Sequence, residues 1–272
     1  MIGNISKMQV ALAEPVEYSL PVNDATLALN RSIGGHVRID YQGEINCISC
    51  GRKTGKSYAQ GHCYPCFISL AECDMCILKP ETCHFAAGTC RQPDWGLAHC
   101  MQPHYVYLAN SSGIKVGITR GSQIPTRWID QGASQALPIF RVESRYQSGL
   151  LEVTIKNHVA DRTDWRKMLR GDPEPVDLAR LRDGLADQCE AEISRLQQTF
   201  GDHAIEYLPA ESVVDIHYPV AEYPQKIRSF NLLKQPRIEG ALLGIKGQYL
   251  ILDTGVLNVR NHAGYKIEVH LN

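Results

Sequence analysis

Nine of the ten cysteines of this chain lie between residues 47 and 100, and they constrain the fold more than any other feature. The first four form two CxxC pairs separated by twelve residues: Cys47, Cys50, Cys63 and Cys66. Two CxxC turns at this spacing aim four thiolates at one tetrahedral zinc ion, as in a zinc ribbon. The surrounding segment has little periodic apolar character, so we expect that it needs a metal ion to fold.

The thiols that follow predict a second zinc site. Four further candidate ligands are Cys73, Cys76, Cys83 and Cys90. Cys100 and three nearby histidines compete for places in this site, so the spacing leaves its fourth ligand open. An iron–sulfur cluster would accept the same kind of ligands. Because neither shell lacks a ligand, we interpret both metal ions as structural.

Length and composition limit the class of protein. With 272 residues, 44% of them hydrophobic, the chain can bury the cores of at least two domains. A formal net charge of -1 means that any surface for nucleic acid must be local. The sequence has no run of eighteen apolar residues, and its first twenty residues are not expected to act as a secretory signal. We therefore expect a cytoplasmic protein with reduced thiols and no contact with membranes.

The pattern of the whole chain predicts an α+β fold made of four segments. Residues 1–44 alternate as β-strands do, and residues 45–100 form the zinc-ribbon-like region. Residues 101–172 predict a small α/β core, and residues 173–272 predict a helix followed by a small β-barrel.

The last segment begins with one long amphipathic pattern. Apolar residues recur at steps of three and four from Leu178 to Phe200, which predicts a helix with one buried stripe. Cys189 lies on that stripe, so we interpret this thiol as a packed small hydrophobe and not as a metal ligand.

The segment after the cysteines carries the strongest candidates for catalysis. Two short strands, HYVYLAN and GIKVGIT, are joined by a turn, and helical segments are expected near 124–134 and 148–170. A hairpin brings Lys115 alongside Tyr107 or one of its neighbours. A helix that follows the hairpin brings Arg127 over the same edge.

This order of residues resembles the core of the GIY-YIG endonuclease superfamily. The sequence YVY at 105–107 stands where the first motif would lie, and KVG at 115–117 stands where the second would lie. Arg127 and Glu152 fall at the positions of the family's helical arginine and glutamate. The resemblance covers about a quarter of the chain. Over nearly its full length, with CxxC pairs ahead of such a core, the chain also resembles an uncharacterised bacterial family of unknown function.

The superfamily resemblance implies a divalent-metal-dependent endonuclease with DNA or RNA as its partner. Glu152 would hold one Mg²⁺ or Mn²⁺ ion, and Arg127 would bind phosphate oxygens. Tyr107 and Lys115 would orient or deprotonate the attacking water. Residues 101–170 contain ten Lys or Arg against five Asp or Glu, which suits a phosphate backbone. Two further candidates for contacts with nucleic acid are Arg120 and Trp128.

Two other functions are compatible with the same residues. The chain could be a catalytically inactive module that binds nucleic acid or protein and contains structural zinc. It could also be a thiol redox protein or a metal-handling protein. A tryptophan such as Trp128 is also commonly a core anchor, and a single helical glutamate is commonly a solvated surface residue. The sequence leaves the oligomeric state open.

Overall fold

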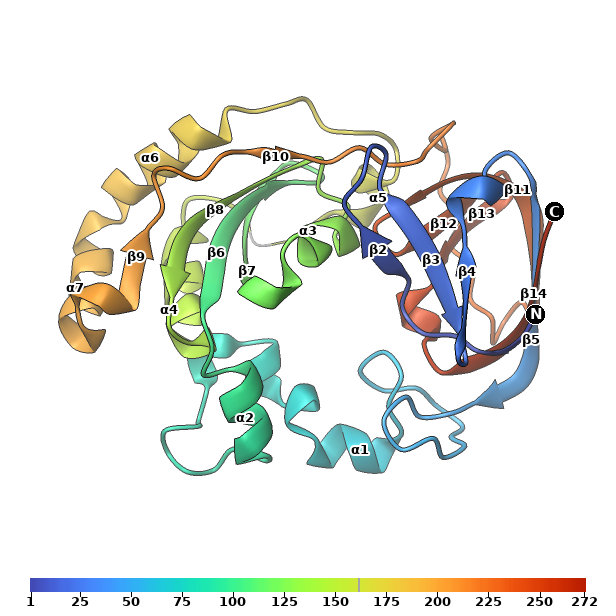
Figure 1. Cartoon of the computed structure of the whole chain (residues 1–272), viewed down its shortest axis with the longest axis horizontal. Coiled ribbons are helices and arrows are strands. Elements are labelled where there is room, and N and C mark those ends of the chain that lie inside the picture. The colour runs from blue at the N-terminus through green and yellow to red at the C-terminus, as the bar shows by residue number, and fades with distance from the viewer. Residues whose placement is uncertain (161) are drawn as a thin grey trace.

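A β-sheet lies at each end of the molecule, and the cysteine-rich region runs along one edge between them (Figure 1). The structure is a computed structural model that describes residues 1–160 and 162–272. It combines helices with antiparallel sheets, so the predicted α+β class is confirmed. In the described part of the chain, no helix is long and apolar enough to cross a lipid bilayer.

The larger sheet combines strands from both ends of the chain. Its strand order is β1-β14-β5-β11-β12-β13. The strands are β1 (Ile2–Asn4), β5 (His36–Ile45), β11 (Arg237–Lys246), β12 (Tyr249–Leu252), β13 (Gly255–Asn258) and β14 (Tyr265–Leu271). Because β1 and β13 are the two ends of this order, the described sheet does not close, and the prediction of a small β-barrel is wrong. A separate three-stranded sheet contains β2 (Gln9–Ala11), β3 (Glu17–Val22) and β4 (Ala25–Ala28).

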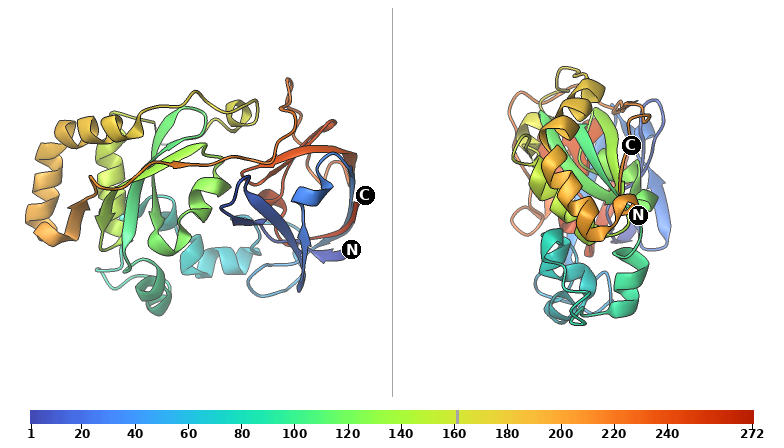
Figure 2. Two further views of the ribbon diagram at one scale, coloured as in Figure 1. Left: turned by 45° about the horizontal axis from the view of Figure 1, so that its top comes forward. Right: turned by 90° about the vertical axis from the view of Figure 1, so that its left-hand side faces the viewer.

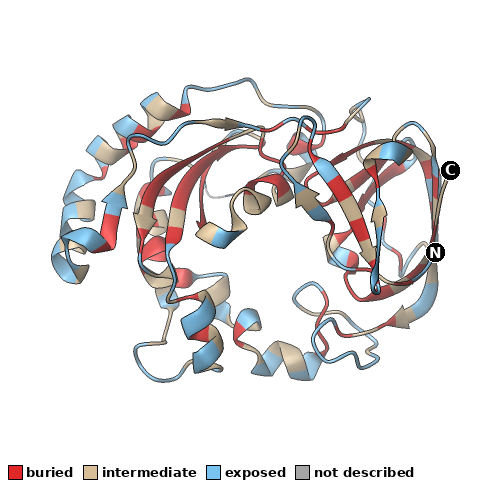
Figure 3. Cartoon of the chain, viewed as in Figure 1, coloured by how far each residue is buried: buried red, intermediate tan, exposed pale blue. Residues whose placement is uncertain are grey.

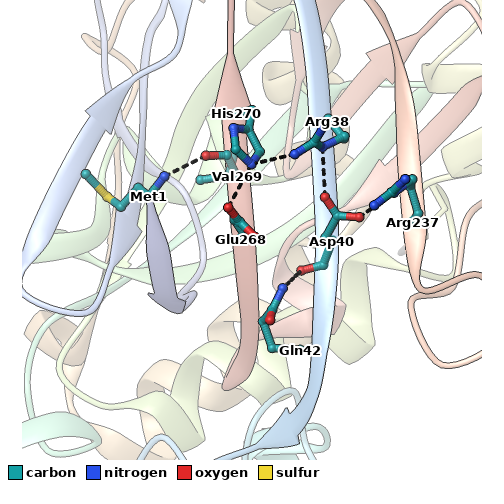
Figure 4. A network of polar contacts seen from close by, with 8 residues as sticks. All are labelled: Met1, Arg38, Asp40, Gln42, Arg237, Glu268, Val269 and His270. Carbon is teal, nitrogen blue, oxygen red and sulfur yellow. Dashed lines mark hydrogen bonds and ion pairs between the residues drawn. The ribbon is translucent and has the colours of Figure 1, made fainter.

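A polar network across the larger sheet connects three neighbouring strands (Figure 4). The carboxylate of Asp40 in β5 accepts hydrogen bonds from Arg237 in β11 and from Arg38 in its own strand. The bond from Arg237 is the largest cause that lowers the pKa of Asp40. A guanidinium nitrogen of Arg38 lies 2.8 Å from Nε2 of His270 in β14. The N-terminal strand β5 is therefore held between two C-terminal strands by side chains as well as by its backbone.

The second sheet contains the predicted hairpin. Its order is β10-β8-β6-β7, with β9 paired to β8. The strands are β6 (His104–Asn110), β7 (Ile114–Arg120), β8 (Gln135–Val142), β9 (Ile205–Tyr207) and β10 (Val214–Asp215). The hairpin of β6 and β7 is confirmed, whereas β8 was not among the predicted strands. Pro138 interrupts the apolar pattern of β8 and lies at a β-bulge opposite Tyr107.

Helices cover this second sheet. They are α3 (Thr126–Asp130), α4 (Arg145–Ile155), α6 (Leu178–Gln188) and α7 (Glu190–Phe200), whereas α5 (Trp165–Met168) packs against β12 and β13 of the larger sheet. The helical segment predicted at 148–170 is therefore two helices, and the helix predicted from 178 to 200 is broken at Cys189. Cys189 is buried as predicted. Apolar residues of β6, β8, α4 and α6 form one core, and Figure 3 shows burial concentrated on the sheets and on the helices that face them.

The cysteine-rich region lies outside both sheets, as the two views of Figure 2 show. It contains two α-helices, α1 (Tyr64–Ser69) and α2 (Pro93–His99). Its 3-10 turns are η2 (Ala71–Cys73), η3 (Met75–Ile77) and η4 (Pro80–Thr82). The 3-10 turns of the other regions are η1 (Asn30–Ser32), η5 (Gly121–Gln123), η6 (Asp202–Ala204) and η7 (Arg260–His262). Most residues of the cysteine-rich region are exposed or half-buried, so apolar burial contributes little to its stability.

Candidate functional site

The first four cysteines meet just beyond the end of β5. The ligand atoms of Cys47, Cys50, Cys63 and Cys66 all lie within 4.8 Å of one another. The sulfurs of Cys50 and Cys63 are 3.7 Å apart. Four thiolates at about 2.3 Å from a tetrahedral zinc ion are ~3.8 Å from one another, so the spacing suits this ion. The cluster could therefore hold a metal ion such as zinc.

Tight turns at glycine bring the two CxxC pairs together. The backbone N–H of Gly51 donates to the carbonyl of Cys47 at 2.8 Å, and Gly51 has a φ of 72°. The N–H of Ile48 donates to the carbonyl of Gly61 at 3.0 Å and so joins the two turns. A Cβ atom at Gly61 would lie 2.8 Å from the side chain of Ile48, so this position needs glycine.

The ionisation of these thiols also favours a cation. Burial opposes the ionisation of Cys47, but hydrogen bonds from the backbone N–H groups of Cys50 and Cys63 lower its pKa to about 6. Burial and the three neighbouring thiols raise the pKa of Cys66 to about 12. Cys47 and Cys66 therefore do not ionise together unless a positive ion neutralises them.

Some of the remaining candidate ligands line one small cavity, and the others do not. A small cavity is lined by Cys76, Cys83, Cys90 and Cys100, together with Asp74 and His84. Cys73 is not among the residues that line it. His99 stacks on Trp95, and His104 is buried in β6. All ten cysteines are free thiols.

A different hollow, of about 140 Å³, lies between β7, α3, α4 and the turns η3 and η4. We call it the candidate site. It brings together three of the four predicted catalytic residues, Lys115, Arg127 and Glu152. Its lining also includes Arg145 and Gln131. Three cationic side chains and one carboxylate in a single hollow suit the binding of an anion.

The register of the β6–β7 hairpin determines where Lys115 lies. Ala109 pairs with Lys115 and Tyr107 pairs with Gly117, so Lys115 and Tyr107 lie on the same face at diagonal positions. A Cβ atom at Gly117 would lie 2.7 Å from the hydroxyl of Tyr107. The tyrosine ring therefore lies directly across Gly117, and a larger residue there would displace it.

Tyr107 does not line the candidate site, because its side chain is fully buried. It affects the site through a residue that does line it. Its hydroxyl donates to Oε1 of Gln131 at 3.0 Å, and Nζ of Lys115 donates to the same oxygen at 2.5 Å. Burial raises the pKa of Tyr107, and the neighbouring guanidinium of Arg127 offsets part of that rise. Tyr107 therefore remains a hydrogen-bond donor that fixes Gln131, which in turn holds Lys115.

Sequence reasoning missed both Gln131 and Arg145. Arg145 is the first residue of α4, and its guanidinium donates to the carbonyl of Ile77 at 2.6 Å. Burial lowers the pKa of Arg145, although an arginine keeps its charge in proteins. A capping box formed by Ser144 and Gln147 starts this helix, and that motif could have located Arg145 from the sequence. No comparable signal marks Gln131.

The two residues proposed to contact nucleic acid do not line the candidate site. Arg120 is the last residue of β7 and pairs with His104, at the far end of the hairpin from Lys115. Trp128 is 2% exposed and packs edge-on against Tyr107, with 6.0 Å between the ring centroids. This position fits the alternative interpretation of Trp128 as a core anchor, since no face of the ring is open to a base.

Comparison with known proteins places the chain in a family. No curated protein and no solved structure matches it. A family model described as "Protein of unknown function (DUF2797)" matches residues 34–267, which include the cysteine region, the candidate site and most of the larger sheet. The chain therefore belongs to the DUF2797 family of proteins of unknown function.

Proposed function

We propose that the candidate site binds the phosphodiester backbone of a nucleic acid and cleaves it with the help of a divalent cation. The observation that carries this proposal is the gathering of Lys115, Arg127, Arg145 and Glu152 around one hollow. The order Tyr107, Lys115, Arg127, Glu152 along the chain supports it further, because the same order underlies the resemblance to GIY-YIG endonucleases.

The cationic side chains and the carboxylate of the candidate site would have different roles. Arg127 and Arg145 would bind phosphate oxygens, because a planar guanidinium matches their geometry and carries a permanent charge. Glu152 would hold Mg²⁺ or Mn²⁺, which supplies charge neutralisation at the phosphate and lowers the pKa of a bound water. Lys115 is 4% exposed and its Nζ donates a hydrogen bond to Gln131. Its ammonium group is therefore fixed in position before the substrate binds, and it would orient the water or the phosphate.

We further propose that the cluster of Cys47, Cys50, Cys63 and Cys66 holds a structural zinc ion. Its four thiol ligands fill a tetrahedral shell and leave no position for a substrate. Ten free cysteines suit a reducing compartment, which supports a cytoplasmic location. The third function considered, a thiol redox protein, would instead require metal that is labile or absent, and elemental analysis distinguishes the two.

A cleavage assay tests the enzymatic proposal. Single- and double-stranded DNA and RNA are incubated with the protein and Mg²⁺ or Mn²⁺, and the wild type is compared with Glu152→Gln. Glu143→Gln is the matched control, because Glu143 is exposed and does not line the candidate site. We expect cleavage by the wild type and the control, and a rate lower by about 100-fold or more for Glu152→Gln.

Equal cleavage by the wild type and Glu152→Gln, or no cleavage by either, would contradict the enzymatic proposal. Binding without cleavage would instead identify the site as a nucleic-acid-binding module, provided that Arg127→Ala abolishes the binding and Glu152→Gln leaves it unchanged.

A further inference from the structure

We propose that the chain binds a second zinc ion through Cys76, Cys83, Cys90 and Cys100, and that this ion holds one wall of the candidate site in place. The inference concerns a metal shell and the packing around it, and it does not depend on whether the candidate site cleaves nucleic acid.

Four separate segments deliver these thiols to one cavity. Cys76 lies in η3, Cys83 directly follows η4, and Cys100 directly follows α2. Cys90 approaches α2 closely, since a Cβ atom at Gly96 would lie 3.3 Å from its sulfur. The cavity that all four line has a volume of about 10 Å³. That volume is about one water-sized sphere, which is room for a single ion.

Cys73 is the thiol that we leave out of the second shell, a choice that the spacing along the sequence left open. It does not line the cavity that the other four thiols share. The first cluster is already complete with four thiols. The nine cysteines of the region thus divide into two sets of four with Cys73 as the spare thiol.

Asp74 and His84 are the competing ligands, because their ligand atoms and the sulfur of Cys76 all lie within 4.8 Å of one another. The four thiols line the same cavity but do not form such a group among the described residues, so binding of an ion must draw their sulfurs closer together. The carboxylate of Asp74 is already paired with Nε of Arg91 at 2.6 Å and caps η3. Nδ1 of His84 lies 2.8 Å from the hydroxyl of Thr89, and Nε2 lies 3.6 Å from Asp74. These contacts assign Asp74 and His84 to the surroundings of the metal shell and leave the four thiols as its ligands.

The same turns form a wall of the candidate site. Ile77, the residue after Cys76, lines both hollows. Its carbonyl accepts the hydrogen bond from the guanidinium of Arg145, and the carbonyl of Cys100 accepts the backbone N–H of Arg145 at 2.8 Å. The first residue of α4 is therefore attached at two points to segments that carry zinc ligands. Loss of the second ion would free both attachment points.

Zinc stoichiometry tests the ligand set. We expect two zinc ions per chain in the wild type, one in Cys90→Ser and Cys100→Ser, and two in Cys73→Ser and His84→Asn. Cys189→Ser is the matched control for replacement of a thiol outside the region. One zinc ion in the wild type would overturn the proposal, as would loss of an ion from Cys73→Ser or His84→Asn.

Two measurements keep the proposal testable if the ligand variants fail to fold. X-ray absorption of the wild-type protein should show four sulfurs around each zinc ion at about 2.3 Å, whereas nitrogen or oxygen ligands would contradict the shell. Hydrogen exchange should show faster exchange at the start of α4 in Cys90→Ser than in Cys73→Ser. Equal protection in these two variants would contradict the link to the candidate site.

Discussion

Replacement of Gly149 by alanine tests the contact between α4 and the cysteine-rich region. A Cβ atom at Gly149 would lie 2.6 Å from the backbone nitrogen of Glu81, 2.6 Å from Cβ of Pro80 and 2.8 Å from the carbonyl carbon of Pro80. These atoms belong to the backbone or to a proline ring, so they cannot rotate away. The helix can relieve the clash only if it moves from η4, and it carries Arg145 and Glu152 with it.

Two opposing effects determine the size of the change in stability. Alanine favours a helix interior over glycine by about 1 kcal/mol. Overpacking costs about 1–3 kcal/mol, and the three contacts at Gly149 place it at the upper end of that range. We therefore expect Gly149→Ala to lower the free energy of unfolding by about 1–2 kcal/mol. The corresponding fall in melting temperature is about 2–8 °C for a chain of this size.

Gly184→Ala in α6 is the matched control. A Cβ atom at Gly184 would meet nothing within 4 Å, so this variant should be more stable than the wild type by about 0.5–1 kcal/mol. Urea denaturation of the zinc-loaded proteins gives both values from the shift in midpoint at constant slope. If both variants prove stabilised, α4 does not pack against η4 as described.

Two further predictions concern buried polar groups. Gln131→Leu removes the acceptor shared by Tyr107 and Lys115, so it should lower the free energy of unfolding, measured in urea, by about 1–3 kcal/mol. Gln131→Glu keeps an acceptor and should lower the free energy of unfolding by less. Equal stability of Gln131→Leu and the wild type would contradict this contact. Burial lowers the pKa of His104 from 6.5 to about 4, so between these pH values the unfolded chain binds a proton at this residue that the folded chain does not bind. The free energy of unfolding should therefore decrease as the pH falls through this window, by about 3 kcal/mol in total, and should be insensitive to His104 above it. Urea denaturation across pH should show a shallower decrease for His104→Asn, and identical profiles would refute the assignment.

Local signals in the sequence predicted the local features. The alternation of HYVYLAN around a turn located β6 to the residue, and the CxxC spacing located the first cluster of thiols. Both features depend on neighbours that are close in sequence, where the periodicity of a strand and the geometry of a tight turn are decisive.

Local sequence patterns did not predict the contacts between segments that are far apart in the sequence. The short strands from about residue 210 onward predicted a small β-barrel, but β5 inserts between β11 and β14, and the described sheet stays open. Cys100, which directly follows α2, lines the same cavity as Cys76, Cys83 and Cys90, whereas the spacing left the fourth ligand of this set open. In the same way, Gln131 follows α3 with no motif around it, and only the hydrogen bonds that it accepts from Tyr107 and Lys115 give it a role.

The position of a bound cation tests the proposed function most directly. Crystals grown with Mn²⁺ give an anomalous signal that locates the ion without reference to activity. We expect an Mn²⁺ ion at the carboxylate of Glu152, inside the hollow that Arg127 and Arg145 line. A fully occupied Mn²⁺ site elsewhere, with the carboxylate of Glu152 free of metal, would contradict it.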